Sequence, residues 1–280
     1  MSNSVQPIGV FDSGLGGISV LREIHRLLPQ EALIYIADSG HAPYGSKSTA
    51  YITQRCLQLS EFLLEQGAKM LVVACNTATA HAIDTMRERL NVPVIGIEPA
   101  VKPAARLTRT GVIGVLATQQ TVKSQRLQRL IDVYASGVKV VAQGCPGLVE
   151  HVEQGDFASA ELKALLLEYT QPLLDQGSDV LVLGCTHYPF LAQTLRDIIG
   201  CDITILETSN AVAKHVLRLL EQHQLKSSNE QQGTVNFYSS KSEPNHWQSM
   251  QLLWQHDLTK AMLPEPYLTI PLQRLAQDPQ

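Results

Sequence analysis

Two cysteines close apolar runs of this sequence in similar surroundings. Cys75 lies in VVACNTATA (residues 72–80) and Cys185 lies in VLVLGCTHYPF (residues 180–190), and amide, hydroxyl or imidazole groups follow each thiol at once. Free cysteines become acid/base groups or nucleophiles where a positive environment lowers the thiol pKa. The pair therefore indicates two acid/base groups. The alternative, two small buried apolar residues, is a common role for free cysteine and stays open.

Each thiol has a candidate neighbour that can donate or accept a proton. Asp12 and Ser13 end another apolar run in VFDSGLGG, and His187 follows Cys185 by two residues. Aspartate and histidine at turns also serve as capping or hydrogen-bonding residues, which is the competing interpretation. No feature of the surrounding sequence LVEHVEQGD identifies Glu153 as a catalytic residue.

Other kinds of site fit the sequence poorly. DSGLGG lacks the G-x-G-x-x-G spacing of dinucleotide sites, and APYGSKS (residues 42–48) lacks the glycines of a phosphate-binding loop. A zinc site built from Cys75, Cys185 and His187 has no C-x-x-C pair and no closed set of four ligands. We therefore expect no metal.

The composition indicates a soluble globular protein with room for two domains. The chain has 280 residues, 44% of them hydrophobic, and a formal net charge of -4 without a dense basic run, so nucleic acid is not an expected partner. Neither a signal peptide nor a membrane-spanning apolar run is visible, which predicts a cytoplasmic protein. The five cysteines are an odd number, which favours free thiols over disulfides.

The apolar runs alternate with segments of helical period, as in parallel sheets flanked by helices. We expect helices over residues 18–28, ending at Pro29, and over 161–177, ending towards a glycine. GTVNFYSS (residues 233–240) predicts a later strand, and the start of the following tail has weak helical character. The predicted strands lie in PIGVF, ALIYIA, MLVVA, VPVIGI, TGVIGVLA, VKVVA, DVLVLG and DITILE.

The chain has the outline of a duplication, since a strand-end turn precedes each cysteine motif at a similar separation. Residues 97–111, with two prolines, are the expected crossover between the halves, and the polar residues 225–232 are an expected surface loop. Ligands of open α/β sheets bind beyond the carboxyl ends of strands, where helices begin. We expect helix N-termini there to bind an anionic group and to lower the pKa of both thiols.

Several segments, taken together and in this order, resemble the bacterial glutamate racemases of the aspartate/glutamate racemase superfamily. The resemblance extends from about residue 8 to 210. It implies an α/β fold of two similar open, mainly parallel sheet domains with flanking helices, related by a pseudo-twofold axis, with the active site in the cleft between them. The matching segments are VFDSGLGG, APYGSKS, VVACNTATA, EPAVKPA, VLATQQTVKS, LVEHVEQG and VLGCTHYPF.

The resemblance implies interconversion of L- and D-glutamate without a cofactor, supplying D-glutamate for peptidoglycan. Inverting the stereocentre requires an acid/base group on each face of the carbon. By analogy Cys75 deprotonates the D-enantiomer and Cys185 the L-enantiomer. Asp12 then assists Cys75, while His187 and Glu153 assist Cys185. An aspartate racemase, or one of broader specificity, is the alternative.

The resemblance also implies the residues that bind the substrate. It places one domain at residues 1–98 plus 208–280 and the other at 99–207. A homodimer, a peptidoglycan-precursor activator and an interaction with DNA gyrase are further partners that it suggests. LETSNAVA (residues 206–213) departs from the family pattern, and the tail beyond residue 240 matches no motif. The expected substrate-binding residues are Asp12, Ser13, Tyr44, Gly45, Asn76, Thr77, Thr118, Thr121, Thr186 and His187.

Overall fold

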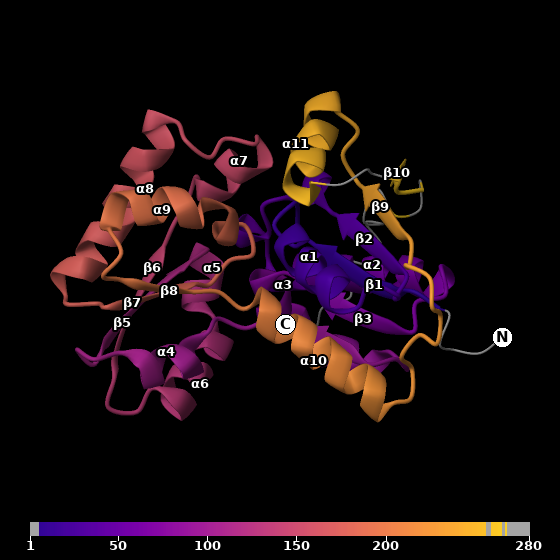
Figure 1. Cartoon of the computed structure of the whole chain (residues 1–280), viewed down its shortest axis with the longest axis horizontal. Helices are drawn as coiled ribbons and strands as arrows, with labels where there is room; N and C mark the ends of the chain where they lie inside the picture. The colour runs from indigo at the N-terminus through magenta and orange to yellow at the C-terminus, as the bar shows by residue number, and fades with distance from the viewer. Residues whose placement is uncertain (1–5, 256–258, 265–266, 268–280) are drawn as a thin grey trace.

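The computed structural model describes residues 6–255, 259–264 and 267, and these form two parallel sheets covered by helices (Figure 1). The first sheet has the strand order β10-β9-β2-β1-β3-β4 and the second the order β6-β5-β7-β8. The strands of the first sheet are β1 (Ile8–Asp12), β2 (Leu33–Ala37), β3 (Met70–Val73), β4 (Val94–Gly96), β9 (Val235–Ser239) and β10 (Thr259–Met262). Those of the second are β5 (Val112–Ala117), β6 (Lys139–Gly144), β7 (Val180–Leu183) and β8 (Thr204–Leu206).

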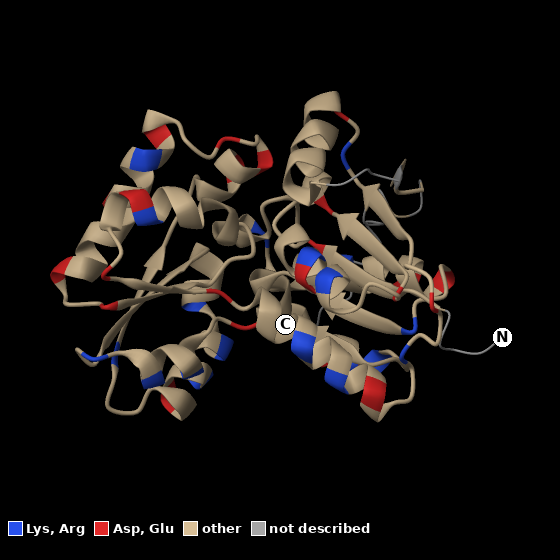
Figure 2. Ribbon diagram, in the orientation of Figure 1, with Lys and Arg blue, Asp and Glu red and all other residues tan. Residues whose placement is uncertain are grey.

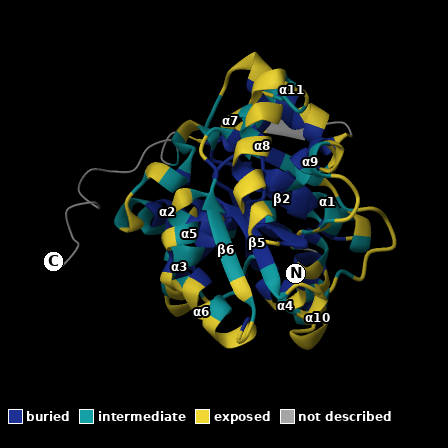
Figure 3. Ribbon diagram, turned by 90° about the vertical axis from the view of Figure 1, so that its left-hand side faces the viewer, coloured by how far each residue is buried: buried dark blue, intermediate teal, exposed yellow. Residues whose placement is uncertain are grey.

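The predicted α/β fold is confirmed, and so are all the strands expected from the apolar runs. Every pairing among the described strands is parallel. β1, β2, β3 and β7 are buried along their whole length, as expected where helices cover both faces of a sheet. β6 lies at the edge of its sheet and is half-buried (Figure 3).

Helices cover both sheets. Those that accompany the first sheet are α1 (Ile18–Leu27), η2 (Ser39–His41), η3 (Tyr44–Ser46), α2 (Thr49–Glu65), α3 (Asn76–Arg89), α10 (Ser209–Gln222) and α11 (Pro244–Trp254). Those that accompany the second are α4 (Val101–Leu107), α5 (Gln119–Lys123), α6 (Gln125–Tyr134), α7 (Leu148–Glu153), α8 (Ala160–Asp175), η4 (Tyr188–Leu191) and α9 (Ala192–Ile199).

The two helix ends expected from the sequence are present. α1 ends at Leu27, two residues before Pro29. After α8, Gly177 adopts a positive φ of 88°, its N–H donates to the carbonyl of Leu174, and the N–H of Ser178 donates to that of Leu173. Glycine adopts this left-handed conformation without a Cβ clash, so it ends the helix and satisfies the last carbonyls.

The chain passes from the first sheet to the second through residues 97–111, as expected, but this segment is more than a linker. It contains α4, which packs on β5 and β7 of the second sheet and on α6. The chain returns after β8, and α10 then packs along α1 beside the first sheet (Figure 1). β9 follows α10 and pairs with β2, so residues far apart in sequence complete one sheet.

The outer surface is polar and mixed in charge. Lys and Arg as well as Asp and Glu are spread over helices of both halves (Figure 2). Residues 225–232 form the expected loop, most of it exposed, and one end is fixed where the N–H of Ser227 donates to the buried Glu31, 2.6 Å away. Among the described residues, no helix combines the length and apolar character needed to cross a bilayer.

Candidate active site

Four strands bring their carboxyl ends to one cavity between the two sheets. β1 and β3 of the first sheet lead to Ser13 and Cys75, and β5 and β7 of the second lead to Thr118 and Cys185. The space between the lining atoms is about 290 Å³, including the part that opens to solvent. Its lining residues are Ser13, Pro43, Tyr44, Gly45, Cys75, Asn76, Thr77, Thr118, Val149, Cys185, Thr186 and His187.

The two thiols share this cavity although they come from different sheets. Cys75 is 4% exposed and Cys185 is 6% exposed. All five cysteines are free, as the sequence predicted. Among the described residues, no group of three or more His, Cys, Asp and Glu side chains is arranged to hold a metal ion, so Cys75, Cys185 and His187 form no such group.

Cys75 caps the N-terminus of α3 and is linked to Asp12. Its Sγ accepts from the N–H of Ala78 at 3.4 Å and donates to Oγ of Ser13 at 3.5 Å, and Ser13 in turn donates to Oδ1 of Asp12 at 3.4 Å. The N–H of Gly17 donates to Oδ2 of Asp12 at 2.8 Å, which fixes the carboxyl group. The thiol of Cys75, the hydroxyl of Ser13 and the carboxyl group of Asp12 are thus connected by consecutive hydrogen bonds.

The expectation of a lowered thiol pKa is wrong for Cys75. Burial raises the pKa of Cys75 well above its ordinary value, and the negative charge of Asp12 raises it further. The hydrogen bonds that Cys75 makes with Ser13 and with the helix N–H of Ala78 lower it, but they are smaller effects. Desolvation therefore outweighs the helix N-terminus, and Cys75 holds its proton near neutral pH.

Burial also raises the pKa of Asp12, whereas the positive charge of His187, the N–H of Gly17 and the thiol of Cys75 lower it. Asp12 is fully buried, so its charged form has lost the solvation of water. The residue that was expected to assist Cys75 is therefore a buried carboxyl group with a raised proton affinity. It can exchange a proton with its neighbours more readily than a surface aspartate can.

Cys185 lies beside a histidine and a glutamate. Sγ of Cys185 is 3.7 Å from Nδ1 of His187, and Nε2 of His187 is 2.7 Å from Oε1 of Glu153. No α-helix begins at Cys185, since the 3-10 turn η4 starts at Tyr188 and α9 starts at Ala192. The local environment of Cys185 is thus an imidazole and not the expected helix N-terminus.

The histidine and the glutamate stabilise each other as charged groups. Burial lowers the pKa of His187, but hydrogen bonds to Cys185 and Glu153 outweigh it and raise that pKa well above the ordinary value. Burial raises the pKa of Glu153, but the hydrogen bond and the charge of His187, with N–H and hydroxyl donors, bring it below the ordinary value. The imidazole of His187 therefore lies between the carboxylate of Glu153 and the sulfur of Cys185.

The glycine-rich turn after β1 contacts this second-sheet pair directly. A Cβ on Gly14 would lie 2.0 Å from Oε1 of Glu153, and one on Gly16 would lie 2.2 Å from Nδ1 of His187. The N–H of Leu15 donates to Oε1 of Glu153 at 2.5 Å. The glycines of DSGLGG are therefore needed for a close approach between the two halves.

Polar groups on both halves surround the rest of the cavity. Oγ1 of Thr77 lies 2.9 Å from that of Thr118 and 3.3 Å from that of Thr121, so hydroxyls of the two halves meet. Oδ1 of Asn76 is buried with no hydrogen-bond partner among the described residues. Asn76 and Thr77 open α3, where N–H groups lack intrahelical acceptors and can bind an anion.

Most of the residues expected to bind substrate line the cavity. Thr121 contacts it through Thr77 and Thr118, and Asp12 and Glu153 lie behind Ser13 and His187. Pro43 and Val149 also line the cavity and were not expected. Both stand inside segments already identified, APYGSKS and LVEHVEQG, but their apolar side chains gave no chemical signal.

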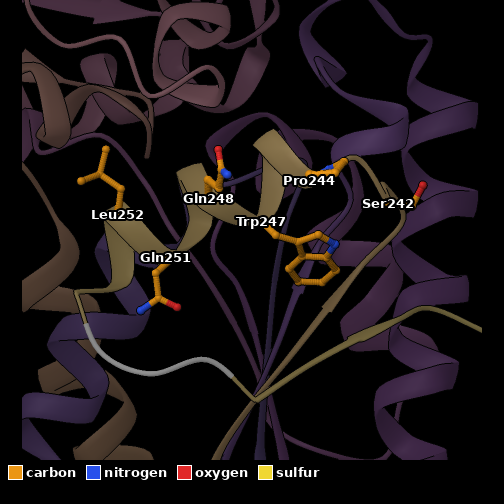
Figure 4. Close-up of a pocket in the computed structure, with 6 residues that line it drawn as sticks. All are labelled: Ser242, Pro244, Trp247, Gln248, Gln251 and Leu252. Carbon is orange, nitrogen blue, oxygen red and sulfur yellow. The ribbon is translucent and has the colours of Figure 1, made fainter.

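Other hollows have a different character. One, with about 540 Å³ of space including the part that opens to solvent, adjoins the cavity and shares Pro43, Gly45, Thr118 and Val149 with it. Another lies on α11 and is lined, among the described residues, by neutral side chains, including Trp247 and Leu252, which point to opposite sides of the helix (Figure 4). Neither hollow contains the thiol pair.

Comparisons with known proteins agree with this geometry. The family model described as Asp/Glu/Hydantoin racemase matches residues 8–216. The glutamate racemase of Methylococcus capsulatus is 51% identical over 254 residues, which cover 91% of this chain and 94% of that protein. The glutamate racemase of Bacillus anthracis has a crystal structure that aligns with a TM-score of 0.84 at 31% identity, covering 94% of this chain and 99% of that chain.

A second structure comes from Escherichia coli. That glutamate racemase, in complex with L-glutamate and the activator UDP-MurNAc-ala, aligns with a TM-score of 0.81 at 32% identity and covers 92% of this chain and 97% of that chain. The aspartate racemase of Picrophilus torridus aligns with a TM-score of 0.50 at 16% identity and shares the fold alone. This chain belongs to the Asp/Glu/Hydantoin racemase family and, within it, to the glutamate racemases.

Proposed function

We propose that this protein interconverts L- and D-glutamate with Cys75 and Cys185 as the two acid/base groups. The observation that carries the proposal is the meeting of two buried thiols, one from each sheet, at one cavity. Each has its own proton-handling neighbour, Asp12 through Ser13 on one side and His187 with Glu153 on the other. This arrangement suits an exchange of protons on opposite faces of one carbon.

The proton transfers follow from the surroundings of the thiols. When L-glutamate binds, the Cys185 thiolate takes the α-proton, and the electron pair left on the α-carbon delocalises into the carboxylate. The Cys75 thiol then gives its proton to the opposite face and becomes a thiolate. The raised pKa of Cys75 favours the protonated form needed here, and the imidazole of His187 lies 3.7 Å from Sγ of Cys185, within reach of its proton. D-glutamate reacts in the reverse direction.

The remaining cavity residues supply contacts for the charged groups of glutamate. We assign the α-ammonium to the unpartnered Oδ1 of Asn76, because that buried acceptor needs a donor. The first N–H groups of α3 and the Thr77, Thr118 and Thr121 hydroxyls suit a carboxylate. Ser13, Tyr44, Gly45, Thr186 and His187 complete the proposed substrate site, with Asp12 behind them.

We extend the proposal to the setting of the reaction. The acid/base scheme uses only side chains of this chain, so we propose that it needs no cofactor, and we propose a cytoplasmic supply of D-glutamate for peptidoglycan. The division into domains at residues 1–98 plus 208–280 and 99–207 is also a proposal, supported by the two sheets. A homodimer, a peptidoglycan-precursor activator and gyrase binding stay proposals that binding assays can test.

A racemisation assay tests the function. Purified protein with L-glutamate, without pyridoxal phosphate or added metal, is expected to drive the circular dichroism of the amino acid to zero and to place solvent deuterium on the α-carbon. Cys75→Ala and Cys185→Ala are each expected to lose at least about a hundredfold in rate. Cys201→Ala, at an exposed thiol, is the matched control. If Cys75→Ala or Cys185→Ala racemises glutamate at the rate of the unchanged protein, the two-thiol scheme is wrong.

Substrate comparison tests the specificity. We expect glutamate to turn over faster than aspartate, since the similar relatives are glutamate racemases and the aspartate racemase structure is distant. Rates for both amino acids, measured by the same deuterium incorporation, decide this. A faster rate with aspartate contradicts the assignment of glutamate.

A further inference from the structure

Ser39 links the first sheet to the proton-handling side chains of the second. It lies two residues after the end of β2, at the start of η2, and is half-buried. Its hydroxyl donates to Oε2 of Glu153 at 2.9 Å, across 114 residues of sequence. Ser39 does not line the cavity and belongs to none of the groups that bind substrate in the proposed reaction. Any effect on the chemistry must therefore pass through Glu153.

The backbone around Ser39 is held firmly in the first half of the molecule. Asp38 is fully buried, and Arg55 donates to both of its carboxylate oxygens, from Nε at 2.8 Å and from Nη2 at 2.6 Å. On the other side, the N–H of Gly40 donates to Oγ of Ser240 at 2.9 Å. A buried two-point ion pair leaves the segment little freedom. Ser39 thus presents its hydroxyl from a fixed position.

The two oxygens of Glu153 have different partners. Oε1 lies 2.7 Å from Nε2 of His187 and accepts from the N–H of Leu15, whereas Oε2 accepts from Ser39. The last torsion of a glutamate side chain is broad and has no sharp preferred value. A hydrogen bond to Oε2 restricts this torsion. It therefore keeps Oε1 directed at His187, which is the group that contacts the sulfur of Cys185.

We propose that Ser39 is a positioning residue for proton transfer at Cys185, acting through Glu153 and His187. The proposal rests on the proposed function. It means that a hydroxyl anchored in the first half of the molecule sets the acid/base geometry of the thiol in the second half. Cys75, which is linked to Asp12 through Ser13, has no part in this chain of contacts.

Isotope effects distinguish such a role from a general loss of structure. The two enantiomers of glutamate have equal free energy, so kcat/KM for the unlabelled substrates is equal in both directions for every variant. If Ser39→Ala slows the steps at Cys185, removal of deuterium from L-[2-²H]glutamate by Cys185 limits the rate more strongly. The deuterium isotope effect on kcat/KM for L-glutamate therefore increases. With D-[2-²H]glutamate the labelled step occurs at Cys75, so its isotope effect decreases.

The experiment compares Ser39→Ala, Ser39→Thr and Ser240→Ala. For Ser39→Ala we expect kcat to fall about tenfold, which corresponds to the loss of one hydrogen bond to a charged group. The isotope effects are expected to move in opposite directions for the two enantiomers. Ser39→Thr keeps the hydroxyl and restores both values. Ser240→Ala removes a contact to the same turn without touching Glu153, so its kcat is expected to stay within about twofold of the unchanged protein.

A second measurement uses a Glu153→Gln background. If Ser39 acts through the Glu153 carboxylate, adding Ser39→Ala to Glu153→Gln changes kcat by no more than about twofold. A full additional loss in the double variant, or isotope effects that stay constant or move together, overturns the proposal. Absence of racemisation in the unchanged protein contradicts the proposed function instead, so the two failures are distinguishable.

Discussion

The backbone nitrogen of Gly16, in the turn after β1, lies 3.2 Å from Nε2 of His187, which follows β7 of the other sheet. This close contact requires a residue without a side chain, because a Cβ on Gly16 would lie 2.2 Å from Nδ1 of His187. The backbone of one half therefore packs directly against the imidazole that contacts the thiol of Cys185 in the other half.

Gly16→Ala is accordingly expected to displace His187 and to lower kcat by about a hundredfold, the size of effect associated with a misplaced catalytic group. Gly114→Ala, which meets Leu181 and Leu173 in the core of the second sheet, is the control. It is expected to lose stability through overpacking while keeping its activity once folded. Racemisation rates and thermal melts of both variants separate the two effects. Normal activity in Gly16→Ala contradicts a catalytic role for this contact.

Removal of Arg55 is expected to destabilise the protein strongly. Its guanidinium and the carboxylate of Asp38 are both fully buried, so Arg55→Leu leaves a buried charge without its partner. Such losses cost about 3–5 kcal/mol of unfolding free energy. Tyr44→Phe, which removes a hydrogen bond to the same carboxylate but leaves its ion pair intact, is expected to cost about 2 kcal/mol. Urea titrations measure both, and equal costs for the two variants contradict this account.

Replacement of Asn76 is expected to change stability and substrate affinity in opposite directions. Asn76→Leu removes a buried acceptor that has no partner among the described residues, so the free protein gains about 1 kcal/mol of stability. The same change removes the proposed acceptor for the substrate ammonium, and KM for glutamate is expected to rise about tenfold or more. Melting curves and initial rates test this, and an unchanged KM contradicts the assignment.

The pair of His187 and Glu153 predicts a characteristic dependence of stability on pH. Because the pKa of Glu153 is lowered, its contribution is present above its unfolded pKa of about 4.3 and is lost as the pH falls. Because the pKa of His187 is raised, its contribution is complete below its unfolded pKa of about 6.5 and is lost as the pH rises through the folded value.

The stability advantage of the unchanged protein over Glu153→Gln is therefore expected to be greatest between about pH 5 and 6.5 and to shrink on both sides. Denaturant titrations across the pH range measure this difference. A difference that is constant with pH shows that the two groups do not stabilise each other as charged partners. Other titratable groups are present in both the unchanged protein and Glu153→Gln, so their contributions to the unfolding free energy cancel in the difference.

Much of the fold could be predicted because its central strands are short, apolar and buried along their whole length. Composition alone indicates a buried parallel strand at Val72 and Val73 of β3 and at Val180 and Leu181 of β7. The segment 97–111 was harder, since its prolines indicated a crossover but did not reveal that Val101–Leu107 form a helix against the second sheet. Proline near a helix start is compatible with both outcomes.

The electrostatics of the site could not be predicted from local sequence. The helix N-terminus after Cys75 was identified correctly, but the direction of the thiol pKa was wrong, because burial and the charge of Asp12 depend on the packed structure. The contact between Ser39 and Glu153 joins residues 114 positions apart and has no signal in either segment. Long-range contacts of this kind arise only when both sheets are assembled.

The burial of Cys75 also has a consequence for oxidative damage. Peroxide attacks the thiolate form of accessible cysteines first, and Cys75 is 4% exposed and retains its proton. Cys201, which is exposed, is expected to form sulfenic acid before it. The proposed acid/base group Cys75 is therefore expected to be protected from irreversible oxidation in the free protein.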